Sequence, residues 1–181
     1  MFIIVGGVVE FDFSRLLEIA DVLCEDGVLD PKNTKAQIGH CRYVPKHYDS
    51  YRFADGEQFH SDIENADIII THGGIGTLVY ALKAGKKVIV FPRLKEFHEH
   101  LDDHQMEICR AFRDAGYVQM ATSKEELAEC IAHTKEFIPK IFLADNTKMI
   151  KILTNYIDGT SNHKNKESNN NDRSDDHYSC I

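Results

Sequence analysis

The chain of 181 residues is long enough for one well-buried domain with an appendage. Its 21 Lys and Arg residues stand against 29 Asp and Glu residues, and the formal net charge of −8 argues against a general nucleic-acid binder and against unaided adhesion to anionic membranes. No apolar run approaches the roughly 18 residues of a membrane-spanning helix, and the apolar residues 1–9 lack the basic flank of a signal peptide. The five cysteines form no CxxC pair, so we expect reduced thiols in a cytosolic protein.

Short apolar runs alternate with amphipathic patterns along the chain. The runs predict strands over residues 2–5, 35–39, 51–53, 67–71, 87–91 and 117–120. The helical patterns cover residues 13–24, 57–65, 76–84, 103–115 and 149–157, and a further helix opens at a capping box of Ser123 and Glu126. Because the strands are continuously apolar and alternate with helices, we expect an α/β fold with a single Rossmann-like, doubly wound parallel sheet.

The last part of the chain has a different composition. Residues 159–181 are rich in Asn, Ser, Asp and Lys and carry few sizeable apolar side chains. Such a stretch cannot bury enough surface to offset its ordering entropy. The sequence therefore predicts a domain over residues 1–158 and a disordered polar tail over residues 159–181.

A glycine-rich segment, residues 72–77 (His-Gly-Gly-Ile-Gly-Thr), lies between a predicted strand and a predicted helix. Glycines let the backbone approach a ligand, and the free N–H groups of a helix N-terminus suit a phosphate. His72 and Thr77 can add hydrogen-bond donors, and a protonated His72 would also offset negative charge. The alternative is a tight strand–helix turn, since the segment is neither a Walker A loop nor GxGxxG.

Two more loops follow predicted strands. In the long polar stretch of residues 92–105, His98, His100 and His104 stand near two aspartates. This set would allow a metal site, but the spacing is not HExxH, and a solvated polar loop is the alternative that we favour. Its His, Asp and Gln side chains also suit hydroxyl-rich substrates such as sugars. Gly6 and Gly7 follow the first strand, where they form either a plain turn or a close approach to a substrate.

Residues 66–116 resemble the C-terminal, nucleotide-sugar-binding half of GT-B glycosyltransferases, which include family 28 and the cytosolic subunit of the dolichol-pathway N-acetylglucosamine transferase. Residues 72–77 match the His-x-Gly-x-x-Ser/Thr pattern that cradles the diphosphate in these enzymes. Residues 84–92 match their small-Gly-x-Pro-x-hydrophobic-Pro strand, with Lys87 where proline is usual. Gln105 matches a glutamine that contacts the donor sugar.

The chain resembles the small subunits of two-component capsular and exopolysaccharide transferases, of the PssE and EpsE type, more closely than it resembles GT-B enzymes in general. In these, Pro-Arg is followed by a Glu-His-x-Asp-Asp-His-Gln run, which here stands as Pro92 and Arg93 followed by residues 99–105. Glu10 and residues 13–16 and 36–39 also fit, so the resemblance covers about residues 1–157.

Residues and resemblance together imply one half of a GT-B fold that acts as the donor-binding, catalytic subunit of a two-component inverting glycosyltransferase. The donor would be a UDP-sugar, with no metal or other cofactor. A membrane-associated partner subunit would hold a lipid-linked saccharide acceptor and keep this cytoplasmic chain at the inner face of the membrane, and no nucleic acid would be involved. The implied substrate-binding residues are Gly7, His72, Gly73, Gly74, Gly76, Thr77, Arg93, Asp103, His104 and Gln105. Glu10 and His100 are the candidates for a general base.

The chain departs from these families at two places. After the first strand, relatives typically have Gly-Thr and often His, where this chain has Gly7, Val8 and Val9. The glutamate that binds the ribose in many GT-B enzymes corresponds to Tyr80. The valines favour an alternative function, a non-catalytic accessory subunit that stabilises or enhances a partner glycosyltransferase. Donor binding by the isolated chain distinguishes the two functions.

Overall fold

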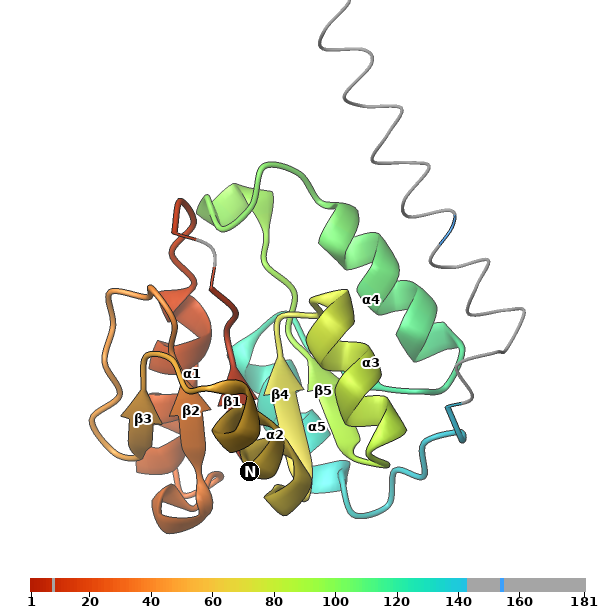
Figure 1. Cartoon of the computed structure of the whole chain (residues 1–181), viewed down its shortest axis with the longest axis horizontal. Helices are drawn as coiled ribbons and strands as arrows, with labels where there is room; N and C mark the ends of the chain where they lie inside the picture. Colours follow the sequence, from red (N-terminus) through yellow and green to blue (C-terminus); the bar gives the residue numbers. More distant parts are fainter. Residues whose placement is uncertain (8, 143–153, 155–181) are drawn as a thin grey trace, which may run out of the picture. The chain divides into compact units, whose positions relative to one another are not determined.

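The computed structural model describes residues 1–7, 9–142 and 154. Residues 1–144 form one compact unit, which Figure 1 shows as a sheet with helices on both sides. The predicted tail and the predicted helix at 149–157, apart from Thr154, lie outside the described residues, so the domain boundary at residue 158 stays a prediction. In the described part of the chain, none of the helices has the length and apolar character that a membrane crossing requires.

Six parallel strands form one sheet in the order β3-β2-β1-β4-β5-β6. The strands are β1 (Phe2–Ile4), β2 (Lys35–Gln37), β3 (Asp49–Tyr51), β4 (Ile68–Thr71), β5 (Lys87–Val90) and β6 (Gln119–Met120). This order confirms the predicted Rossmann-like, doubly wound parallel sheet. The order reverses between β1 and β4, and doubly wound sheets bind their ligands at the carboxyl ends of the strands beside such a reversal.

Helices cover both faces of the sheet. They are α1 (Ser14–Glu25), η1 (Pro31–Asn33), α2 (Gly56–Asn65), α3 (Ile75–Lys83), η2 (Lys95–Phe97), α4 (His104–Asp114) and α5 (Lys124–His133). Helix α1 contacts α5, and Figure 1 shows α5 behind the sheet with α3 and α4 in front of it. The central strand β1 is therefore covered on both sides, and Phe2, Ile3 and Ile4 are at most 1% exposed.

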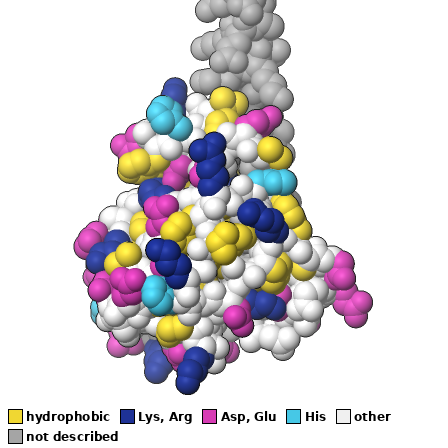
Figure 2. Space-filling model, turned by 90° about the vertical axis from the view of Figure 1, so that its left-hand side faces the viewer, with side chains coloured by type: hydrophobic (Ala, Val, Ile, Leu, Met, Phe, Trp, Pro, Cys, Tyr) yellow, Lys and Arg dark blue, Asp and Glu magenta, His cyan; other side chains and the backbone are white. Residues whose placement is uncertain are grey.

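The surface carries its charges in a mixed arrangement. On the face in Figure 2, Lys and Arg side chains are interspersed with Asp and Glu. The formal charge of −8 is therefore not gathered into one acidic area on that face.

The strands predicted over residues 35–39 and 117–120 are each two residues longer than β2 and β6. Two other elements differ in a way that their contacts explain. The third strand runs over Asp49–Tyr51 instead of residues 51–53, because its ladder begins where Asp49 pairs with Lys35 of β2. An edge strand needs no apolar pattern for this pairing, and the apolar Phe53 that suggested the strand is 51% exposed. At α5, the Ser123 hydroxyl accepts from the backbone N–H of Glu126 (3.2 Å), as a capping box predicts. The Glu126 carboxylate accepts from the backbone N–H of Thr122 (2.7 Å).

Gly39, just after β2, allows the ends of β1 and β2 to approach closely. Its φ of 55° lies in the left-handed region, and a Cβ there would collide with the carbonyl oxygen of Gly6. Gly39 therefore leaves room for the backbone of Gly6, at the start of the loop after β1. By contrast, Gly27 at the end of α1 also has a positive φ of 72°, but a Cβ there would meet nothing within 4 Å.

We predict that Gly39→Ala destabilises the domain more than Gly27→Ala does. Both substitutions force a side chain into the left-handed region, at a cost of about 1 kcal/mol. Only Gly39→Ala adds a steric collision with backbone, which costs about 1–3 kcal/mol more. Urea unfolding of the two variants measures the difference, and equal losses would show that the contact between Gly39 and Gly6 can relax freely.

Candidate functional site

The three loops that carry the predicted site residues lie at the carboxyl ends of neighbouring strands. They follow β1 (residues 5–13), β4 (residues 72–74) and β5 (residues 91–103). The first two flank the reversal in strand order, where doubly wound sheets bind their ligands. Contacts of His72 and Arg93 connect the three loops with one another.

The His72 ring fills the space between the loops after β1 and β4. Its Nδ1 lies 3.4 Å from the carbonyl oxygen of Ile4 and 3.4 Å from the Thr71 hydroxyl. A Cβ at Gly6 would stand 2.8 Å from His72 Cε1, and a Cβ at Gly74 would stand 2.5 Å from His72 Nε2. Both positions therefore need glycine to leave room for the ring, which is a requirement beyond that of a simple turn.

The imidazole of His72 is neutral at pH 7. Burial lowers the pKa of His72 to about 4, and the charge of Arg93 acts in the same direction, while the carbonyl of Ile4 opposes it. His72 can still donate a hydrogen bond from one ring nitrogen. In this structure His72 therefore offers a hydrogen bond at neutral pH, whereas its charge-offsetting role stays conditional on protonation.

The turn between β4 and α3 presents unpaired backbone N–H groups. Gly74 is the N-cap of α3 and no side chain caps the helix, so the N–H groups of Ile75, Gly76 and Thr77 have no partner within the helix. Gly73 has a φ of 86°, and a Cβ there would collide with the Cys109 sulfur of α4. This helix end has the geometry and the dipole that an anion needs.

Gly76 differs from the other glycines of this turn. It is exposed, and a Cβ at this position would meet no protein atom within 4 Å. The protein's own packing therefore gives no reason for glycine here. An approaching ligand would give one.

Arg93 lies buried beneath the loops, with 2% of its surface exposed. Its guanidinium donates to the carbonyl oxygens of Val5 (2.6 Å), Phe11 (3.0 Å) and Glu99 (3.3 Å). Burial lowers the pKa of Arg93, but a guanidinium stays charged at every working pH. The predicted phosphate contact would require this group to leave three carbonyls. The structure instead gives Arg93 the role of tying the loop after β1 to the loop after β5.

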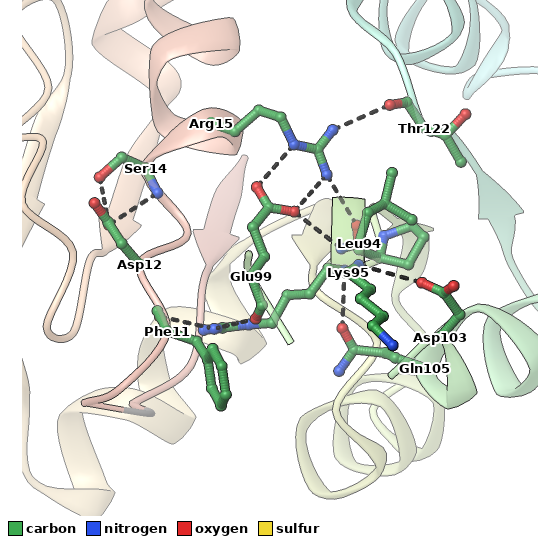
Figure 3. Close-up of polar contacts among 12 residues, drawn as sticks. Phe11, Asp12, Ser14, Arg15, Leu94, Lys95, Glu99, Asp103, Gln105 and Thr122 are labelled. Carbon is green, nitrogen blue, oxygen red and sulfur yellow. Dashed lines mark hydrogen bonds and ion pairs between the residues drawn. The ribbon is translucent and has the colours of Figure 1, made fainter. Parts of the chain in front are cut away.

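Gln105 and Asp103, at the start of α4, both contact the loop after β5. Gln105 is 8% exposed and accepts from the backbone N–H of Arg93 (2.9 Å) through Oε1. Asp103 accepts from the backbone N–H of Lys95 (3.2 Å). Figure 3 shows both side chains directed at this loop. The amide nitrogen of Gln105 is left to donate to a ligand.

The two candidate general bases lie on loops at the carboxyl ends of the strands, Glu10 after β1 and His100 after β5. His100 Nδ1 lies 3.1 Å from the carbonyl oxygen of Asp102, and its ring stacks on Phe11 at 6.0 Å between centroids. Glu10 is exposed. Gly7 lies close to Phe53, whose Cε1 would be 3.2 Å from a Cβ at that position.

Residues 1–7 and 9–142 contain no group of three His, Cys, Asp or Glu side chains that could hold a metal ion. The His104 side chain is outside this description.

Sequence analysis missed two residues that hold the site together, Arg15 and Glu99. Glu99 is the first residue of the Glu-His-x-Asp-Asp-His-Gln run, but the sequence assigned it no role. Arg15 lies in the amphipathic helix predicted over residues 13–24. In the structure they form a two-pronged ion pair, with Arg15 Nε and Nη2 each 2.8 Å from a Glu99 carboxylate oxygen. The two residues are 84 positions apart, and no local pattern marks such a pair.

With the fold and the site described, comparison with known proteins identifies the family. The chain matches the glycosyltransferase family 28 C-terminal domain over residues 5–170 and belongs to that family. Among curated proteins it resembles UDP-N-acetylglucosamine transferase subunit ALG13 of Homo sapiens, at 28% identity over 95 residues, which is 49% of this chain and 8% of the human protein. The subunit of the same name from Kluyveromyces lactis is 28% identical over 106 residues, or 56% of this chain and 47% of the yeast protein. The chain thus spans less than half the length of either relative.

Solved structures share the fold. The NMR solution structure of ALG13 superposes with a TM-score of 0.58 at 17% identity, covering 84% of this chain and 93% of that chain. Spinosyn forosaminyltransferase SpnP superposes with a TM-score of 0.52 at 15% identity, covering 75% of this chain but 35% of its own. The single sheet therefore corresponds to one part of a longer glycosyltransferase chain such as SpnP.

We predict that His72 makes the stability of the domain depend on pH between about 6.5 and 4. The folded state, with a His72 pKa of about 4, binds fewer protons in this window than the unfolded chain, so stability is lost as the pH falls. Between pH 7 and pH 5 the wild type should lose about 2 kcal/mol more than His72→Gln. Urea unfolding at each pH measures this loss, with His133→Gln on the exposed end of α5 as the control. Parallel pH curves for wild type and His72→Gln would contradict a neutral, buried His72.

Proposed function

We propose that this chain is the donor-binding, catalytic subunit of a two-component inverting glycosyltransferase that transfers a sugar from a UDP-sugar to a lipid-linked acceptor in polysaccharide biosynthesis. The observation that carries the proposal is the uncapped N-terminus of α3 at the reversal in strand order, in a chain of family 28. Its N–H groups and the hydrogen bond that neutral His72 can donate suit a diphosphate. The relatives from human and Kluyveromyces lactis carry UDP-N-acetylglucosamine in their name, which supports a UDP-sugar.

In the proposed reaction, an acceptor hydroxyl attacks the anomeric carbon of the sugar from the face opposite the diphosphate. The bond between that carbon and the diphosphate oxygen breaks, UDP leaves, and the configuration inverts. Negative charge grows on the departing diphosphate, where the N–H groups of Ile75, Gly76 and Thr77 stabilise it. This stabilisation supports a reaction without a metal or other cofactor.

The proton of the acceptor hydroxyl goes to a general base. Glu10 or His100, on the loops at the same end of the sheet, would accept it, or the partner subunit supplies the group. Gln105, with His104 and Asp103 beside it, would orient the sugar through the amide N–H that the contact with Arg93 leaves available.

The partner subunit is part of the proposal. The described residues form one sheet, and the relatives are named as subunits of a transferase. We propose that a membrane-associated glycosyltransferase subunit supplies the lipid-linked acceptor and keeps this chain at the cytoplasmic face of the membrane.

One observation favours a second candidate, the non-catalytic accessory subunit. Val9 is 73% exposed on the loop after β1 and offers no polar group to a substrate. An accessory subunit would hold the same fold and stabilise the partner without binding a nucleotide. Nucleotide binding therefore separates the two candidates.

We predict that Gly76→Ala weakens UDP binding at least tenfold without destabilising the fold. A methyl group at this position meets no protein atom and raises helix propensity by about 1 kcal/mol, but it would stand where the diphosphate approaches. Gly56→Ala at the start of α2, where a Cβ also meets nothing within 4 Å, is the matched control. Calorimetric titration with UDP and a thermal melt give both quantities. Equal affinities in the two variants would place the nucleotide elsewhere, and a wild type that binds no UDP would favour the accessory subunit.

We predict that sugar transfer needs the partner. The isolated chain should bind UDP but should not transfer sugar to a lipid-linked acceptor, because nothing in it is assigned to hold that acceptor. Membranes that contain the partner subunit should restore transfer, measured with a panel of radiolabelled nucleotide sugars. Efficient transfer by the isolated chain would overturn the two-component proposal.

A further inference from the structure

The loop after β5 is held at its middle by one buried carboxylate. Glu99 is 2% exposed, and both of its oxygens are engaged. Each accepts from the Arg15 guanidinium at 2.8 Å, and one of them also accepts from the backbone N–H of Leu94 (3.0 Å). Glu99 thus closes the loop onto its own beginning while Arg15 of α1 holds its carboxylate (Figure 3).

Arg15 is fixed as firmly as its partner. Two of its three remaining N–H donors reach the carbonyl oxygens of Thr122 and Pro92, each at 3.1 Å. The guanidinium carbon lies 4.6 Å from the ring centroid of Phe91 and 4.6 Å from that of Phe97. A planar group held by hydrogen bonds at its edge and by aromatic rings at its faces has little freedom to move.

The Arg15–Glu99 pair reaches the predicted sugar-binding residues through backbone. The carbonyl oxygen of Glu99 accepts from Arg93 (3.3 Å), and the N–H of Arg93 donates to Gln105 (2.9 Å). Beyond Glu99, the loop is tied at Asp103, which accepts from the N–H of Lys95. The pair therefore sets the course of the backbone against which Gln105 is aligned.

A cavity of about 420 Å³ lies beside the loop after β5, and two of the residues that line it are contacted by the Arg15–Glu99 pair. These are Leu94, whose backbone N–H donates to Glu99, and Thr122, whose carbonyl oxygen accepts from Arg15; Asp103 also lines the cavity. A loosened pair would change the shape of this cavity and the course of the loop together. The α3 N-terminus receives no contact from either side chain.

We propose that Arg15 and Glu99 are positioning residues that set the sugar-facing loop of the site and leave the diphosphate-binding turn unaffected. The inference rests on the proposed function, because it assigns the loop after β5 to the sugar and the turn before α3 to the diphosphate. It goes beyond that function by naming the pair on which sugar discrimination depends.

Arg15→Lys and Glu99→Gln are the test variants. Lysine keeps the charge but cannot make the two-pronged contact, and glutamine keeps the shape but loses the charge. The double variant Arg15→Met/Glu99→Leu removes both charges, so no buried charge is left unpaired if a single variant folds poorly. Lys35→Met is the control, because it breaks a pair of similar length, to Asp62 at 2.8 Å, at the opposite ends of the strands.

Two measurements decide the proposal. Calorimetric titration compares UDP with UDP-N-acetylglucosamine, UDP-glucose and UDP-galactose. Amide hydrogen exchange follows the N–H groups of Leu94 and Arg93. In the variants, UDP affinity should stay within about twofold of wild type, discrimination among the three UDP-sugars should fall at least about fivefold, and exchange at Leu94 should accelerate at least about tenfold. Lys35→Met should change none of these.

Three outcomes would overturn the proposal. Unchanged exchange at Leu94 would show that the pair does not hold the loop. A parallel loss of UDP and UDP-sugar affinity would assign the pair a merely structural role. If the wild type binds all three UDP-sugars with the same affinity as UDP, the sugar makes no favourable contact with the loop after β5. If the wild type binds none of these ligands while exchange at Leu94 still accelerates in the variants, the proposed function fails and the hold of the pair on the loop stands.

Discussion

The arrangement of the site depends on one buried cation, the guanidinium of Arg93. It joins the carbonyl oxygens of Val5, Phe11 and Glu99, which belong to the loops after β1 and β5. A buried charge is costly unless polar groups surround it, so these carbonyls are held at fixed positions around the guanidinium. Phe13 adds a ring face 4.9 Å from the guanidinium carbon. Arg93 therefore fixes two of the three loops at the end of the sheet where we propose that the substrate binds.

The cation also acts on the proposed diphosphate site without touching it. Its charge, together with burial, keeps His72 neutral, and the neutral ring fits between Gly6 and Gly74. The anion binding that we propose for the turn would therefore come from the N-terminus of α3 and from hydrogen bonds, with no charged side chain. Such a preorganised site has little reorganisation to undergo as charge develops on the leaving group.

Much of the fold could be predicted from the sequence, because continuous apolar runs such as Ile68–Thr71 and Lys87–Val90 report directly on a parallel sheet covered on both faces. The bounds of the edge strand β3 were harder to predict, because pairing with β2 sets them and the apolar pattern does not. Residues 72–77 were recognisable because backbone geometry demands glycines in a short segment. The pair of Arg15 and Glu99 was not, because it depends on two elements meeting in space, and the role of Arg93 was misjudged for the same reason.

We propose that a nucleotide diphosphate binds at the carboxyl ends of the strands, on the turn before α3. Backbone amide chemical shifts, recorded while UDP is added to the ¹⁵N-labelled chain, locate the bound nucleotide. We expect the largest shifts at residues 73–77, with smaller ones at Gly6 and Gly7 and little change at α2 or α5. Shifts centred on α2 or α5, or none at saturating UDP, would contradict it.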